Sequence, residues 1–154
     1  MRKVCEVAEF FWKLRTRMRF GKLSRAPLQL LRFELRTEGA ECEWIARGPD
    51  PWDADVATEV RDRNTALQAL LDAIALREMI FTVIPGIDSA KFKVYRQGEV
   101  PELIITGSVS RDDDAPPRIS SLVMRAKLYG LHFSIEDGVL EPLQLAADSL
   151  EFAT

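Results

Sequence analysis

The segment from Thr65 to Ile84 restricts the possible folds more than any other part of the sequence. It has the length and pattern of a helix, yet its large apolar side chains point to several sides instead of forming one stripe. A helix of this kind is buried on more than one face. We therefore expect it to lie across a sheet, and it could also contact a second subunit. The apolar side chains are Leu70, Ile74, Met79, Ile80, Phe81, Val83 and Ile84.

The helical pattern begins upstream of this segment. Asp53 is a suitable N-cap, and Pro85-Gly86 ends the pattern after Val83. One continuous helix would contain about 28 residues and measure about 42 Å. A break near Asn64-Thr65, both capping residue types, would divide it into two helices. The predicted inner stripe consists of Val56, Val60, Leu67, Leu71 and Ile74.

Three pairs of strands are predicted around this helix. In each pair, apolar and polar residues alternate, and residues such as Asp137-Gly138 turn the chain tightly between the strands. Strands joined in this way pair in an antiparallel manner. The predicted pairs are 31–36 with 42–47, 91–96 with 102–110, and 131–136 with 139–143.

A further helix is predicted between the second and third strand pairs. It starts at Pro117 and stops at Gly130, and the tail from Gln144 is a candidate for one more short helix. The predicted fold is therefore α+β, an antiparallel sheet of about six strands with two or three packed helices in the order α-ββ-α-ββ-α-ββ. The length fits one domain spanning residues 1–154.

Residues 1–25 form a basic amphipathic element at the N-terminus of this domain. Val4, Val7, Phe11, Leu14 and Met18 follow the spacing of a helix, which we expect over residues 3–19. Alternation of apolar and basic residues over 12–20 also permits a strand, but Lys, Arg, Leu and Met favour the helix. A strand would align the cations on one face, whereas a helix would spread them around its sides. The element ends at Gly21 in either case.

The charge is distributed unevenly. Residues 1–36 contain ten basic and three acidic residues, a net charge of +7, whereas residues 37–154 contain 11 basic and 21 acidic residues, a net charge of −10. Such asymmetry occurs in proteins that contact nucleic acids or membrane surfaces. We favour a simpler interpretation, in which the basic segment is neutralised by the acidic remainder of its own chain or of a second copy.

No catalytic or metal-binding motif is present in the sequence. His132, Ser134 and Glu136 share one face of a predicted strand, but neighbours on that face lie about 6.6 Å apart, too far for a nucleophile and its base. The acidic segment that begins at Asp50 lacks the glycine of an EF-hand and has Arg61 at the position of the bidentate glutamate. We predict no catalytic residue, no metal ligand and no cofactor.

The two cysteines, Cys5 and Cys42, match neither a disulfide scaffold nor a zinc site. Residues 1–25 lack the apolar run of a secretory signal, and no run of about 20 apolar residues could span a bilayer. We expect a reduced, cytoplasmic setting.

The preferred functional hypothesis is a non-enzymatic module that self-associates, or binds a protein partner, through its basic N-terminal segment. The predicted contact residues are Trp12, Lys13, Arg15, Arg17 and Arg19.

Two alternatives remain open. One is a small-molecule binder or enzyme with a pocket between the sheet and the 65–84 helix, for which Arg77, Glu78 and Tyr95 are the candidate polar groups. The other is binding of single-stranded nucleic acid by the Arg/aromatic segment, although a pI near 5.3 disfavours it. Binding to a membrane surface is disfavoured as well.

Overall fold

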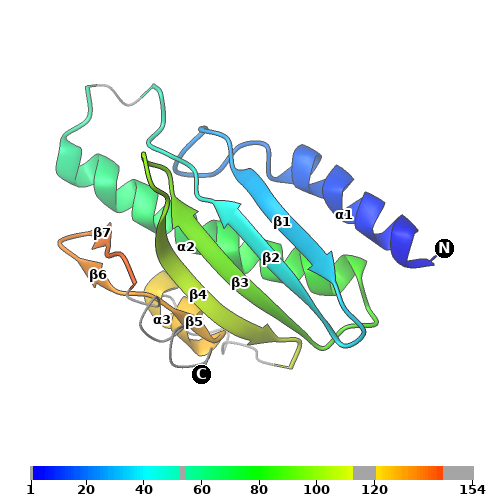
Figure 1. The fold of residues 1–154 in the computed structure, drawn as a ribbon. Helices are drawn as coiled ribbons and strands as arrows, with labels where there is room; N and C mark the ends of the chain where they lie inside the picture. The colour runs from blue at the N-terminus through cyan, green and yellow to red at the C-terminus, as the bar shows by residue number, and fades with distance from the viewer. Residues whose placement is uncertain (1, 53–54, 113–120, 144–154) are drawn as a thin grey trace.

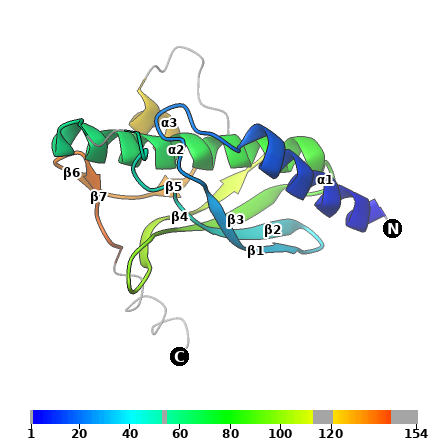
Figure 2. The ribbon, with the colours of Figure 1, turned by 90° about the horizontal axis from the view of Figure 1, so that it is seen from above.

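Among the residues that the structure describes, three helices lie on one face of a five-stranded sheet, and no helix covers the opposite face (Figures 1 and 2). The computed structural model describes residues 2–52, 55–112 and 121–143. The helices are α1 (Arg2–Arg17), α2 (Thr58–Val83) and α3 (Leu122–Leu128). The strands of the sheet are β1 (Gln29–Leu35), β2 (Gly39–Ile45), β3 (Ser89–Arg96), β4 (Glu102–Ser110) and β5 (Leu131–His132). A separate two-stranded sheet contains β6 (Ile135–Glu136) and β7 (Val139–Leu140).

The predicted α+β class and the order of elements are confirmed. The sheet, however, is mixed: the order is β1-β2-β3-β4-β5, and β2 and β3 run parallel, with Cys42 opposite Phe92. Parallel neighbours need a long crossover connection, which α2 supplies by carrying the chain back along the sheet (Figure 1). The prediction of a purely antiparallel sheet of about six strands is therefore wrong at the β2–β3 pair, and the last hairpin forms a sheet of its own.

The long helix α2 is continuous from Thr58 to Val83, so the helix has no break at Asn64-Thr65. Its predicted inner stripe is only partly right: Ile74 is buried, but Val60 is 41% exposed, and Gln68, Asp72 and Arg77 are buried instead. The apolar surface of α2 on several sides is explained within one chain, since α2 packs on the sheet and also contacts α1 and α3. This feature therefore gives no support for a second subunit.

The inner face of the sheet supplies the other half of the core. Trp44 and Phe92 lie beneath α2 with their rings 5.1 Å apart in an edge-to-face arrangement, and both side chains are buried. Alternate residues such as Glu43 and Lys93 point to the open face. This alternation is what a sheet covered on one side requires.

The N-terminal segment is helical, so the strand alternative is wrong for residues 2–17. Phe10 anchors α1 to the sheet: its side chain is fully buried and stacks on Phe33 of β1, with ring centroids 4.4 Å apart. Met18 is also buried behind the last turn. In Figure 1, α1 lies alongside β1 at the edge of the sheet, which leaves the other side of α1 exposed.

The chain after β4 agrees with the prediction in part: helix α3 and the hairpin turn are present, but the predicted strand 131–136 is divided into β5, which pairs with β4, and β6, which pairs with β7. Ser121 caps α3 by accepting a hydrogen bond from the Met124 amide at 3.3 Å, and Gly130, at a φ of 97°, ends it. Asp137 and Gly138 also have positive φ angles, as the predicted hairpin turn requires. The predicted helix start at Pro117, the N-cap Asp53 and the tail from Gln144 lie outside the described residues.

The two cysteines differ in their surroundings. Cys42 is buried on β2, and burial raises the pKa of its thiol to about 12, so it remains protonated near neutral pH. Cys5, on α1, is exposed. Within the described residues, no helix is both long enough and apolar enough to cross a membrane.

Candidate interaction surface

The loop that follows α1, residues 18–26, is fixed to the core by one arginine. The guanidinium of Arg47 donates hydrogen bonds to the carbonyl oxygens of Met18, Arg19 (3.2 Å) and Ala26 (3.0 Å). Arg47 stands directly after β2 and is 2% exposed. The loop therefore has a defined path although it contains no regular secondary structure.

Arg47 is held in turn by two residues of α2. Its Nε donates to Asp72 Oδ2 at 2.8 Å, and Gln68 Nε2 donates to Asp72 Oδ1 at 2.9 Å. Gln68 Oε1 accepts a hydrogen bond from the Leu23 amide at 2.6 Å. We call Arg47, Gln68 and Asp72 the Arg47 clamp. Burial raises the pKa of Asp72, and the hydrogen bonds from Arg47 and Gln68 oppose this effect only in part.

Gly21 allows the loop to approach the clamp closely. A β-carbon at this position would lie 2.4 Å from the side-chain carbonyl carbon of Gln68. A larger residue would have to displace either the loop or Gln68, so residue 21 needs a glycine for lack of space.

Four of the five predicted contact residues lie on two sides of α1, and the fifth, Arg19, lies just beyond its C-terminal end. Trp12, Arg15 and Arg19 follow one another at three- and four-residue spacing, and all three are exposed. Lys13 and Arg17 face α2 across a hollow that is also lined by Glu78, and Lys13 forms an ion pair with Glu9 at 3.4 Å. The segment thus spreads its cations as predicted and does not bring the five predicted contact residues together on one surface.

The predicted neutralisation of the basic segment holds for part of it. Arg25 pairs with Asp50 at 3.4 Å, and Arg32 and Arg36 pair with glutamates of the first hairpin. Four other cations have no carboxylate within 4.0 Å in the described part of the chain. These four are Arg15, Arg17, Arg19 and Lys22.

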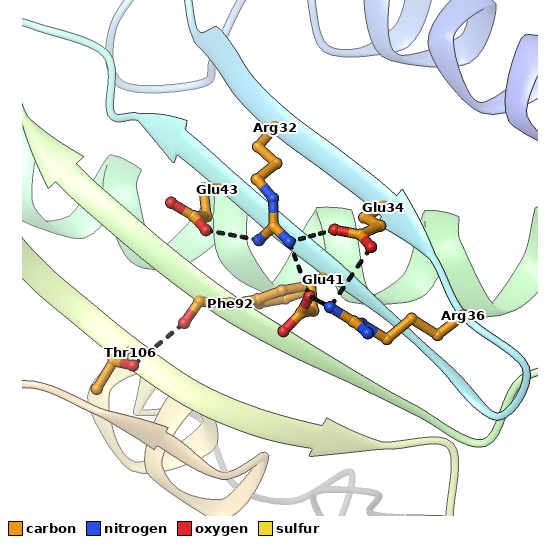
Figure 3. Close-up of polar contacts among 7 residues, drawn as sticks. All are labelled: Arg32, Glu34, Arg36, Glu41, Glu43, Phe92 and Thr106. Carbon is orange, nitrogen blue, oxygen red and sulfur yellow. Dashed lines mark hydrogen bonds and ion pairs between the residues drawn. The ribbon is translucent and has the colours of Figure 1, made fainter. Parts of the chain in front are cut away.

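Figure 3 shows the ion pairs of Arg32 and Arg36 on the open face of the sheet. Arg32 donates to Glu43 and to Glu41, both at 2.9 Å, and also to Glu34, while Arg36 reaches Glu41 at 2.8 Å. The arginine hydrogen bonds hold the pKa of Glu41 below its usual value. Within this network, which spans β1 and β2, Arg32 and Arg36 are already paired with glutamates. They therefore do not add to a cationic contact surface.

We expect Glu41→Gln to make the protein less sensitive to acid than the wild type. Because the folded pKa of Glu41 lies below the unfolded value of 4.5, its contribution is present above that value and is lost as pH falls through the folded pKa. The effect is small, since Arg32 and Glu41 are both accessible to solvent. Melting temperatures at pH 7 and near pH 3 should show a smaller decrease for Glu41→Gln than for the wild type.

Glu99→Gln is the control for this measurement, because Glu99 is exposed and forms no ion pair with a described residue. It should follow the wild type at both pH values. A decrease for Glu41→Gln equal to that of the wild type would contradict the assigned role of Glu41.

The other sequence candidates do not assemble into a site. Arg77 lies on the helix side of the sheet, where it donates to the Ser110 carbonyl at 2.9 Å. Tyr95 lies on the open side, where burial and the nearby Glu43 raise its pKa. His132 is exposed. Within the described residues, no group of three His, Cys, Asp or Glu side chains could hold a metal ion.

The Arg47 clamp is the arrangement that sequence reasoning missed. Arg47 is distant in the sequence from Gln68 and Asp72, and it meets them only because α2 crosses over the sheet beside the end of β2. The one available signal was the presence of Gln68 and Asp72, four residues apart, in a largely apolar stretch.

The fold and this surface define the class of the protein: an α+β domain with a cationic, aromatic-bearing helix along the edge of its sheet. No protein-family model matches the sequence. No curated protein and no solved structure matches it either.

Proposed function

We propose that the protein is a non-enzymatic binding module that self-associates through the exposed face of α1. The observation that supports this most is a 61% exposed Trp12 between Glu9 on one side and Arg15 on the other. Arg15 has no carboxylate within 4.0 Å in the described part of its own chain. Tryptophan and arginine are the residue types that contribute most to protein interfaces.

The exposed face of α1 is complementary to itself when two copies pair in antiparallel orientation. With Trp12 on a twofold axis, Glu9 of each copy lies opposite Arg15 of the other, because both are three residues from Trp12. The carboxylate of Glu9 is about half exposed in spite of its ion pair with Lys13. Antiparallel pairing also keeps the two cationic ends of α1 apart, whereas parallel pairing would place them side by side.

A charge-swap experiment tests this arrangement. We expect Glu9→Arg and Arg15→Glu each to weaken dimerisation by tenfold or more, as truncated or reversed interface charges do. The double variant Glu9→Arg/Arg15→Glu should restore it, since the complementary pairs are formed again with exchanged partners. Sedimentation velocity over a range of concentrations, at low and at high salt, measures the dissociation constants.

The matched control is Lys91→Glu on the open face of the sheet. Lys91 is exposed, and its replacement changes the net charge as Arg15→Glu does, but it lies on β3, which β2 separates from the strand next to α1 (Figure 1). Its dissociation constant should equal that of the wild type. A wild-type monomer at several hundred micromolar, or a charge swap that fails to restore association, would contradict the proposal.

Cys5 provides a direct measurement of the orientation. It is exposed and Cys42 is buried, so a nitroxide reagent should label the native protein at Cys5. In the antiparallel pair, the two Cys5 positions are about 21 Å apart along the helices and 8–10 Å apart across them, which predicts label separations of about 20–30 Å. Parallel pairing would place them within about 10 Å.

Single-stranded nucleic acid is the second candidate partner, and a specific observation favours it. Phe20 is 59% exposed beside the unpaired cations, and the Arg19 guanidinium lies 5.2 Å from the centre of its ring. Bases stack on such rings while cations contact phosphates. Binding of a dT15 oligonucleotide that weakens steeply with salt, and that Arg15→Ala/Arg19→Ala reduces, would support this function.

A further inference from the structure

A cavity of about 330 Å³ lies at the opposite end of the sheet from the N-terminus of α1. It opens where the parallel strands β2 and β3 end, between the N-terminal half of α2 and β7. The carboxyl ends of parallel strands joined by a helix are the usual place for a ligand site. The volume is at the lower end of the range for small-molecule pockets.

The walls of this cavity are mostly apolar. Ala46 continues the inner face of β2, Ala69 faces it from α2, and Ile104 and Leu140 close the far side. Two alanines at facing positions leave room that larger side chains would fill. The cavity therefore exists because small residues lie on both β2 and α2, and it suits the hydrocarbon part of a ligand.

Among the polar side chains that line the cavity, Asp62 and Thr65 of α2 offer hydrogen-bond acceptors, whereas the Gln97 amide can both donate and accept. Asp62, Thr65 and Ala69 lie on one face of α2, at three- and four-residue spacing. The Thr65 hydroxyl donates its proton to the Arg61 carbonyl at 2.8 Å, so towards a ligand it can only accept. Asp62 forms no ion pair or hydrogen bond with any described residue.

The cations at the cavity are already engaged. Arg96 donates to the Leu140 carbonyl at 2.7 Å and to Glu102 at 3.0 Å, and Arg47 belongs to the clamp. An anionic ligand would therefore face the Asp62 carboxylate without a free cation to offset it. A cationic donor would instead find the carboxylate and the threonine oxygen together.

We propose that this pocket binds a small primary alkylammonium ion, with its alkyl chain between Ala46, Ala69 and Leu140 and its ammonium group on Asp62. The site is formed by α2, β7, the segment that follows β2, the end of β3 and Ile104 of β4, and no residue of α1 lines it. The proposal is therefore independent of self-association, and failure of either one leaves the other standing.

Amide NMR titrations with hexylammonium chloride and with hexan-1-ol test the proposal. The two probes share an alkyl chain and differ in the charged donor. We expect hexylammonium to bind at least tenfold more tightly than hexan-1-ol, with the largest shifts at Ala46, Ile104 and Leu140. Asp62→Asn should remove this tenfold preference, whereas Asp88→Asn, outside the pocket, should preserve it.

Ala69→Leu should abolish binding of both probes by filling the cavity. If this core variant does not fold, the comparison of Asp62→Asn with Asp88→Asn still decides the question. Equal affinities of the two probes, an unchanged preference in Asp62→Asn, shifts centred elsewhere, or no binding at 10 mM would each overturn the proposal.

Discussion

Asp72→Ala is expected to destabilise the fold by about 3–5 kcal/mol, because it leaves the guanidinium of Arg47 buried without its counter-charge. The side chains of the pair are 1% and 5% exposed, so water cannot replace the lost carboxylate without opening the core. The loss has a second consequence. Arg47 also holds three carbonyl oxygens of the 18–26 loop, and a displaced guanidinium would release that loop from the end of β2.

Urea denaturation followed by circular dichroism gives the free energy of unfolding. The control is Asp62→Ala, on the same helix but only partly buried and without an ion pair to a described residue, which should change stability by less than about 0.5 kcal/mol. A loss below 1 kcal/mol for Asp72→Ala would mean that the pair has no structural role. The double replacement Arg47→Met/Asp72→Leu should recover part of the loss, because it leaves no unpaired charge. The loss that remains comes from the loop carbonyl oxygens, which no longer have a hydrogen-bond donor.

The pairs of strands were predictable because alternation reports which side chains face the core. Residues 102–110 form β4 as predicted, and the turn at Asp137-Gly138 joins β6 and β7. Alternation does not report which strands become neighbours. The parallel β2–β3 pair depends on the path of α2, which no local pattern encodes.

The buried face of α2 was predicted only in part, for a related reason. The sequence stripe counted apolar residues, whereas the helix buries Gln68, Asp72 and Arg77 and exposes Val60. Polar residues can occupy buried positions when partners from distant segments satisfy them. Those partners, Arg47 for Asp72 and the Ser110 carbonyl for Arg77, are 25 and 33 residues away along the chain.

The sequence identified the residues of the proposed contact surface but not how these residues are arranged in space. Composition singled out the Arg-rich segment, and the structure exposes Trp12 and Arg15 on α1 and Arg19 in the loop that follows it. What composition could not provide was the pairing of each cation. That depends on the fold, which brings Asp50 to Arg25 and leaves Arg15 without a carboxylate in the described residues.

Phe10→Ala is expected to cost about 3–5 kcal/mol of folding free energy, the usual loss for a buried phenylalanine. Phe10 is fully buried, stacks on Phe33 at 4.4 Å and contacts the edge of Phe11 at 5.9 Å. Its removal would leave a cavity between α1 and β1. Helix α1 should therefore unfold locally more often than the sheet does. Hydrogen exchange should then be faster in α1 than in β3, and urea denaturation should report the overall loss.

Trp12→Ala separates anchoring from association, because Trp12 lies two residues away from Phe10 but points to solvent. We expect it to leave the free energy of unfolding of the monomer within about 0.5 kcal/mol of the wild type while weakening self-association. Equal losses of monomer stability in the two variants would show that Trp12 packs against its own chain, and the exposed face of α1 would then lose the residue on which the proposed dimer is centred.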